Sequence, residues 1–319
     1  MRPEGSEKDA LIVVAGPTAS GKSALAFAVA EACNGEIVNA DSMQVYKELR
    51  VLTARPSPAD EARVPHHLYG VMSVSEVCSA GVWLRMAEDA IAAIRARGRL
   101  AIVCGGTGLY LKVLAEGIAE VPEVPKAVVD EGRGVYDTEG GEVFRERLAV
   151  LDADAAARLA AGDRQRLVRA WAVVTATGRT LAQWQAGQAG TSPVSGRHLI
   201  LTLTPPRDLL YARIEARLDA MIAAGALDEV AALADLDPGP DQPAMKALGV
   251  PDFRRHLEGH CDLAAALDKA KQATRNFAKR QLTWFRHQMT ADLVIEEFGD
   301  RALDQGVKAV QEFLSVSQG

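Results

Sequence analysis

The chain has 319 residues, of which 48% are hydrophobic and 24% charged, and its formal net charge is −6. This composition is typical of a globular protein with one large core and a smaller second domain, and the acidic balance taken alone argues against a nucleic-acid partner. The four cysteines show no CxxC or Cys/His spacing, and no apolar run reaches about 18 residues. We therefore expect no disulfide, zinc site, signal peptide or membrane span, and place the protein in the cytoplasm.

The first apolar run, Leu11–Ala15, leads into a glycine-rich loop. This loop reads GPTASGKS from Gly16 to Ser23 and precedes the helix-like run Ala24–Ala30. Such a strand–loop–helix setting is that of a P-loop, in which backbone N–H groups converge on phosphate oxygens at a helix N-terminus. Lys22 adds a point charge, and the Ser23 hydroxyl can reach a metal or a phosphate oxygen. The sequence thus predicts a site for a di- or triphosphate; a chance glycine-rich turn is the alternative.

Four apolar runs are predicted to be buried parallel strands, because each precedes a loop and then helical periodicity. They are Leu11–Ala15, Glu36–Ala40, Leu100–Cys104 and His198–Leu203. Strand signals then vanish over 119–195, where the sequence is rich in Ala, Arg and Leu. We predict an α/β fold with a P-loop parallel sheet flanked by helices. Its core would comprise 9–118 and 196–319, with one long helix over about 263–288, and an all-helical insertion would span 119–195.

Two more predicted strands end in polar loops at the edge of the sheet that carries the P-loop. Open α/β sheets bind ligands at this edge. Asp41 follows the second strand, and its carboxylate could coordinate magnesium or accept a proton from a nucleophile; alternatively, it caps the next helix. The third strand ends in GGTG at 105–108, which offers the Thr107 hydroxyl to the same crevice or is only a tight turn.

Basic residues gather in two stretches, 145–179 and 269–286. Arg166 and Arg169 lie three residues apart, on neighbouring helical positions, and could grip nucleic-acid phosphates. A solvated helix face is the alternative interpretation. Arg213 and Arg217 lie four apart and can point to one spot, as the cations above the phosphates do in P-loop kinases.

Taken together, seven motifs resemble those of the tRNA dimethylallyltransferase (tRNA isopentenyltransferase) family. They are GPTASGKS at 16–23, DSMQVYKELRVLTARP at 41–56, PHHL at 65–68, GGTGLYLKVLAEG at 105–117, DRQRLVRA at 163–170, PPRDLLYARIEARLDAMIAAG at 205–225 and TRNFAKRQLTWFR at 274–286. The resemblance implies transfer of a dimethylallyl group from dimethylallyl diphosphate to N6 of the adenosine at position 37 of tRNAs, next to the anticodon, with release of diphosphate.

The resemblance also implies residue roles. Asp41 would be the general base, Thr107 would orient the amine, and Lys22 would offset charge on the leaving group, with Mg²⁺ as cofactor near Ser23. Diphosphate would be bound by Arg217 and the P-loop, that is, by Gly16, Pro17, Thr18, Ala19, Ser20, Gly21, Lys22 and Ser23. The tRNA anticodon stem-loop, with its target base flipped out, would contact Asp41, Ser42, Met43, Gln44, Thr107, Gln165, Arg166, Leu167, Val168 and Arg169, and a further tRNA contact would lie at Met245–Val250.

Four positions depart from the family pattern, and they concern the tRNA footprint rather than the chemistry. Arg164 stands where the family usually has Pro, Ala172 where it has Glu, Val250 where it has Tyr, and Val129 where a basic residue is expected. Two other enzymes remain as alternatives: an isopentenyltransferase acting on free adenine nucleotides, which would not need the basic insertion, and a P-loop small-molecule kinase using ATP. A nucleotide-gated binding module without catalysis is a third. We expect a monomer.

Overall fold

The computed structural model describes residues 9–119, 121–186, 193–239 and 241–316. The chain divides into two compact units, which we describe separately. The core unit combines Met1–Ala115 with Pro193–Gly319, and the insertion unit is Glu116–Ser192. The predicted insertion includes residues 120 and 187–192, which lie outside the described residues, as does the segment 1–8 in which no signal peptide was expected.

One sheet of six parallel strands forms the centre of the core unit, in the order β3-β2-β4-β1-β5-β6. The strands are β1 (Leu11–Ala15), β2 (Gly35–Asn39), β3 (His66–His67), β4 (Leu100–Gly105), β5 (His198–Leu203) and β6 (Leu293–Ile295). The four predicted strands and the α/β class are confirmed. Sequence analysis missed the two edge strands, because runs of two and three residues carry no readable periodicity.

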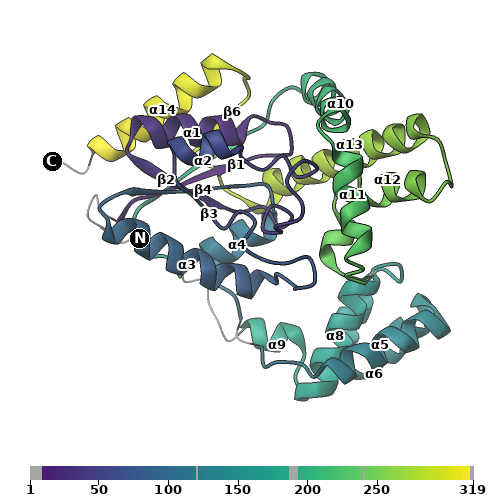
Figure 1. Ribbon diagram of the computed structural model, residues 1–319. Coiled ribbons are helices and arrows are strands. Elements are labelled where there is room, and N and C mark those ends of the chain that lie inside the picture. The colour runs from purple at the N-terminus through teal and green to yellow at the C-terminus, as the bar shows by residue number, and fades with distance from the viewer. Residues whose placement is uncertain (1–8, 120, 187–192, 240, 317–319) are drawn as a thin grey trace. The chain divides into compact units, whose positions relative to one another are not determined.

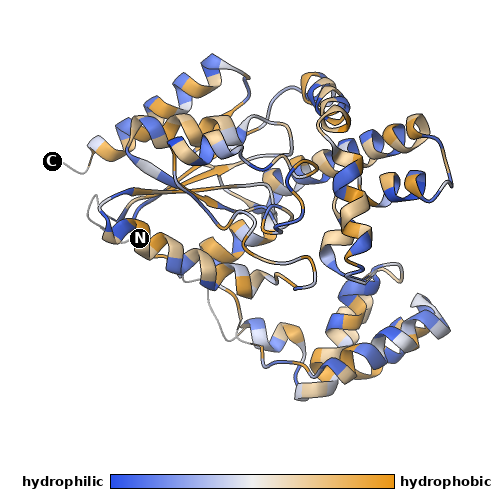
Figure 2. Ribbon diagram, in the orientation of Figure 1, coloured by the Kyte–Doolittle hydropathy of each residue, from blue (hydrophilic) through white to orange (hydrophobic). Residues whose placement is uncertain are grey.

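Helices cover both faces of this sheet (Figure 1). On one face lie α1 (Lys22–Ala32) and α14 (Asp300–Ser315), and on the other lie α3 (Ala80–Ala96) and α4 (Gly108–Glu116). Val14 packs with Leu25 of α1 on the first face, whereas Val13 packs with Trp83 of α3 on the second. Because both faces are covered, the central strands β1 and β4 are apolar along their length, while helices such as α14 carry both hydrophobic and hydrophilic residues (Figure 2).

A second group of helices in the core unit packs around one long helix. It comprises α10 (Arg207–Ala223), α11 (Ala226–Asp235), α12 (Val250–Leu257) and the long helix α13 (Leu263–Gln288). The short helix α2 (Pro58–Arg63) does not belong to this group. The predicted long helix is therefore confirmed as α13. Ion pairs tie it to α10, with 2.5 Å between Arg275 Nη1 and Glu215 Oε1 and 2.6 Å between Lys271 Nζ and Asp219 Oδ1. The helix is thus a fixed element of the core unit.

Helices are the regular elements of the insertion unit within its described residues. Its helices are α5 (Lys126–Glu139), α6 (Gly141–Leu151), α7 (Ala153–Arg158), α8 (Arg164–Thr177) and α9 (Leu181–Ala186). Phe144 and Leu148 of α6 form its core with residues of α7 and α8. A side chain at Gly132 of α5 would place its Cβ 2.8 Å from the Trp171 ring, so a glycine allows α5 and α8 to approach closely.

The four cysteines carry no disulfide. Cys104 is buried, which raises the pKa of its thiol to about 11, while the other three are half-buried. All four are thus free thiols in this structure. No helix among the described residues is long and apolar enough to cross a membrane.

Candidate active site

The P-loop turns sharply between β1 and α1. Gly21 caps α1 with a φ of 93°, a left-handed conformation that glycine adopts without strain. A Cβ at Gly16 would lie 2.8 Å from Ser20 Oγ and 3.0 Å from Leu203 O, so only glycine fits there. These two glycines bring the loop backbone to the N-terminus of α1, where N–H groups and the helix dipole attract anions.

Three basic side chains surround this loop, and each contacts a neutral oxygen of it. Lys22 Nζ donates to Pro17 O at 3.3 Å, and Arg213 Nε donates to Ala19 O at 3.2 Å. Arg217 donates to the Thr18 hydroxyl. Arg213 also stacks on Phe298, 4.6 Å from the ring centroid. The structure thus brings together Lys22 and Arg217, which were predicted to bind diphosphate.

The charges at this site point to an anionic ligand. Burial lowers the pKa of the Lys22 ammonium, and the negative charge of Asp41 counteracts that shift only in part. Burial likewise lowers the pKa of Arg217, with Asp41 opposing the shift and Arg213 adding to it. Cations that are desolvated in this way are stabilised when a diphosphate binds beside them.

Asp41 lies directly after β2 in a loop held by side chains. Asp41 N donates to Asn39 Oδ1 at 2.8 Å, and Asn39 Nδ2 donates to Asp41 O at 2.9 Å. One carboxylate oxygen of Asp41 accepts from Met43 N at 2.9 Å. The carboxylate therefore closes an Asx turn instead of capping a helix, and its position is fixed relative to the sheet.

Thr107 joins the loop after β4 to the Asp41 loop. Its Oγ1 accepts from Ser42 N at 2.9 Å and donates to Ser42 Oγ at 3.3 Å. Behind it, a Cβ at Gly105 would lie 2.1 Å from Ala40 O, so the two strand ends can approach only because residue 105 has no side chain. The glycines of the GGTG segment thus bring Thr107 to Ser42, the residue after Asp41.

The segment after Asp41 is stabilised by contacts that sequence analysis missed. Gln44, predicted to contact tRNA, donates its Nε2 to Thr53 O at 2.8 Å and Ala54 O at 3.1 Å. Glu229 of α11 accepts from three successive backbone N–H groups, those of Arg50, Val51 and Leu52, at 2.7, 2.7 and 2.9 Å. Gln44 therefore stabilises the segment that runs from Asp41 to Ala54. No local pattern links Glu229 to residues about 180 positions earlier.

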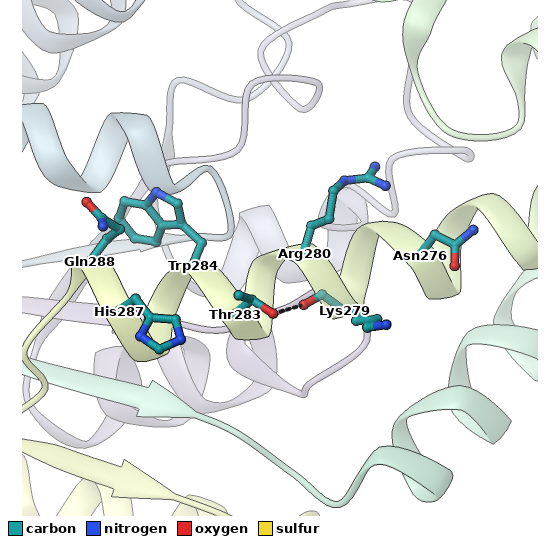
Figure 3. A pocket seen from close by; sticks show the side chains of 7 residues that line it. All are labelled: Asn276, Lys279, Arg280, Thr283, Trp284, His287 and Gln288. Carbon is teal, nitrogen blue, oxygen red and sulfur yellow. Dashed lines mark hydrogen bonds between the residues drawn. The ribbon is translucent and has the colours of Figure 1, made fainter. Parts of the chain in front are cut away.

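A cavity of about 580 Å³ opens along α13, and Figure 3 shows the seven side chains that line it. They are Asn276, Lys279, Arg280, Thr283, Trp284, His287 and Gln288. A Cβ at Gly108 would lie 2.5 Å from the Trp284 ring, so this indole packs against the start of α4, one residue after Thr107. In the sequence this cavity is marked by the basic and aromatic motif TRNFAKRQLTWFR, although the motif alone predicts none of the lining residues as site residues.

The insertion unit displays some of its predicted contact residues and buries others. Gln165, Arg166 and Arg169 are exposed on α8, and Arg166 Nε lies 3.5 Å from Asp163 Oδ2. Leu167 and Val168 are 0% and 5% exposed. Their side chains belong to the core of the unit, so of the five residues predicted here to contact tRNA only Gln165, Arg166 and Arg169 have exposed side chains. The helical period places them on the opposite face from the arginines.

The four departures from the family pattern fit their local surroundings. Arg164 is the first residue of α8, a position that proline also suits, and here its guanidinium lies 2.5 Å from Asp137 Oδ2. Ala172 and Val250 are fully buried, and Val129 packs against the core of the insertion unit. Each of these three positions thus contributes packing.

A P-loop, a fixed carboxylate and a hydroxyl meet at the carboxyl edge of a parallel sheet, which is the arrangement of a P-loop enzyme of the transferase class. A family model described as IPP transferase matches residues 44–288, and another, described as isopentenyl transferase, matches residues 9–68. The chain belongs to the IPP transferase family.

Relatives of the chain cover most of its length. It is 52% identical over 287 residues to the tRNA dimethylallyltransferase of Rhodospirillum rubrum, covering 90% of this chain and 88% of the relative. It is 53% identical to that of Phenylobacterium zucineum, covering 87% and 89%.

Solved structures agree. A full-length tRNA isopentenylpyrophosphate transferase from Bacillus halodurans matches with a TM-score of 0.70 at 29% identity, covering 97% of this chain and 98% of that one. A eukaryotic dimethylallyltransferase acting on tRNA matches with a TM-score of 0.82 at 25% identity, covering 96% and 80%.

Proposed function

We propose that this protein transfers the dimethylallyl group of dimethylallyl diphosphate to N6 of the adenosine at position 37 of tRNA and releases diphosphate. The observation that carries this proposal is the meeting of two partly buried cations, Lys22 and Arg217, with the carboxylate of Asp41 at one edge of the sheet. Relatives that span nearly the whole chain are named for this activity.

The geometry supports a displacement in which the amine attacks the allylic carbon. The bond between N6 and this carbon forms while the bond from the carbon to the diphosphate oxygen breaks, and the electron pair leaves with the diphosphate. Lys22 and Arg217 stabilise the negative charge that grows on the leaving group. Asp41 accepts the proton that N6 loses, and Thr107 orients the amine from the loop joined to Ser42.

We propose Mg²⁺ as the cofactor. The donor set suits it, because Mg²⁺ usually binds one or two protein oxygens together with phosphate oxygens and water. Among the described residues no group of three or more His, Cys, Asp and Glu side chains could hold a metal on its own, so Ser23 would hold the ion jointly with the diphosphate. A bound ion would add positive charge beside the leaving group.

The tRNA would be recognised by surfaces on both units. The target base must leave the stacked anticodon loop to react, and Ser42 and Met43 would contact it beside Asp41. On the insertion unit, the exposed Gln165, Arg166 and Arg169 would contact the phosphates of the anticodon stem-loop.

The cavity along α13 adds cationic side chains and an indole, the groups that bind phosphates and stack on bases. We further propose that the protein acts as a monomer, since one chain supplies every group named, and that it works in the cytoplasm with its tRNA.

Labelled dimethylallyl diphosphate and magnesium test this proposal. Parallel reactions would contain an anticodon stem-loop with adjacent adenosines, free AMP, or ATP with small acceptors. Label on the stem-loop alone is the expected result. Label on AMP would replace the proposal with a free-nucleotide isopentenyltransferase, and consumption of ATP without prenyl transfer would replace it with a kinase.

A further inference from the structure

Gln281 of α13 is a buried amide whose two ends reach different loops of the site. The residue is 7% exposed. Oε1 accepts from the backbone N–H of Thr18 at 2.8 Å, and Nε2 donates to the backbone carbonyl of Gly106 at 2.8 Å. These partners lie 263 and 175 residues away in the sequence. One side chain thus joins the P-loop to the loop after β4.

These two loops have opposite tasks in the reaction. Thr18 belongs to the loop proposed to hold the leaving group, while Gly106 precedes Thr107, which is proposed to orient the nucleophile. The junction is tight as well: a Cβ at Gly106 would lie 2.5 Å from Gln281 Nε2 and 3.1 Å from Gly16 O. The amide therefore bridges the two loops directly beyond the last paired residues of β1 and β4, Ala15 and Gly105.

The support for this amide is rigid. Gln281 lies on the 26-residue helix α13, which ion pairs to Glu215 and Asp219 anchor on α10. Displacement requires the amine, the allylic carbon and the leaving oxygen in line, with the reacting atoms about 3–3.5 Å apart, and a misplacement of about 1 Å costs about 100-fold in rate. A fixed spacer between the two loops meets that requirement.

We infer that Gln281 is a positioning residue that sets the distance between the diphosphate loop and the Thr107 loop, and with it the alignment of amine and leaving group. This inference rests on the proposed transfer reaction. If Gln281 served stability alone, its substitution would affect folding. It would not make the rate of transfer depend on whether the side chain can donate a hydrogen bond to Gly106 O.

Gln281→Glu removes the hydrogen bond at one end of the side chain and keeps the one at the other end, with almost no change in shape. The carboxylate still accepts from Thr18 N–H, but it has no proton for Gly106 O and repels it. When protonated, the acid regains a donor. We expect kcat to fall about 100-fold at pH 8, with KM for dimethylallyl diphosphate within about 3-fold of wild type. The ratio of variant to wild-type kcat should rise as the pH is lowered towards 6, because burial beside a carbonyl favours the protonated form.

Two further variants make the test decisive. Gln281→Met fills the space without either hydrogen bond, so its kcat should be low at every pH, relative to wild type. Gln272→Glu makes the same chemical change at an exposed position of α13 and should keep the wild-type kcat and pH profile. Melting temperatures of all variants identify any loss that comes from unfolding.

The outcomes distinguish the inference from the proposed function. Wild-type kcat for Gln281→Glu across this pH range would overturn the inference, as would a loss equal to that of Gln281→Met with no recovery at low pH. Wild-type protein that fails to label the stem-loop would overturn the proposed function instead. Low kcat, nearly constant KM and recovery on acidification support both.

Discussion

Replacement of Asp41 by Asn removes the proposed base and retains the turn that holds it. The Asn side chain keeps an oxygen that can accept from Met43 N, where Asp41 Oδ1 now accepts at 2.9 Å, and the Asn39 bonds to the backbone of residue 41 do not change. A positioned general base contributes about 100- to 10,000-fold to a rate, or about 2.7–5.5 kcal/mol of activation free energy. We expect kcat to fall within this range.

The affinity of Asp41→Asn for dimethylallyl diphosphate should rise or stay constant, although its kcat falls. Asp41 repels the incoming diphosphate, while its charge acts on both Lys22 and Arg217, so its neutralisation should not raise KM for dimethylallyl diphosphate. Single-turnover transfer of label gives the chemical rate, and filter binding of the stem-loop gives tRNA affinity. Asp41→Ala, which also loses the Asx turn, is the control for loop shape. A rate for Asp41→Asn within about 3-fold of wild type would refute the role of Asp41 as base.

Three other predictions concern charge, stability and loop order. The double substitution Arg166→Ala and Arg169→Ala should weaken stem-loop binding and reduce the slope of log K against log salt by about 1.5, because each phosphate contact releases a counterion. An unchanged slope would mean that the two arginines form a solvated helix face and do not contact the phosphates. Glu36, 3% exposed, accepts from three basic side chains. Burial raises the pKa of its carboxyl, but these hydrogen bonds outweigh burial and lower it below its ordinary value of 4.5. Glu36→Gln should therefore lower the free energy of unfolding by denaturant by about 1–3 kcal/mol near pH 7. This difference in free energy between variant and wild type should shrink as the pH falls below 4.5, because the stabilisation by a carboxyl with a lowered pKa is lost on acidification. A difference that is constant with pH would contradict this prediction. Glu229→Ala should speed hydrogen exchange at the amides of Arg50 and its two successors, while equal protection would show that the segment holds without it.

Much of the fold was predictable because its signals are local. The apolar strands, the P-loop and the long helix α13 each depend on neighbouring residues, and all appear where the sequence predicts them. The strand β3 and the strand β6 were missed since each is held by pairing with one neighbour and not by a pattern of its own. Local periodicity thus finds the centre of the sheet and misses its edges.

The site was predictable only in its loops. Asp41 and Thr107 follow strands, so their meeting follows from the topology of a parallel sheet. Gln281 and Glu229 lie on helices far along the chain, and their partners are backbone groups, which have no residue type to reveal them. Leu167 and Val168 show another limit of a motif, because it lists successive residues of α8. With about 3.6 residues per turn, the helix directs these two side chains into the core of the insertion unit and the flanking Arg166 and Arg169 to its surface.

The partners of the site cations explain why this edge of the sheet suits a leaving diphosphate. On α13, Lys271 and Arg275 are neutralised by carboxylates of α10. Within the described residues, Lys22, Arg213 and Arg217 instead donate to neutral oxygens of the P-loop. Neutral oxygens orient a cation without cancelling its charge, so only the nearby carboxylate of Asp41 opposes the positive charge that Lys22 and Arg217 direct at the loop. The same bonds hold the cations in place before the ligand arrives, and little reorganisation is needed when the carbon–oxygen bond breaks.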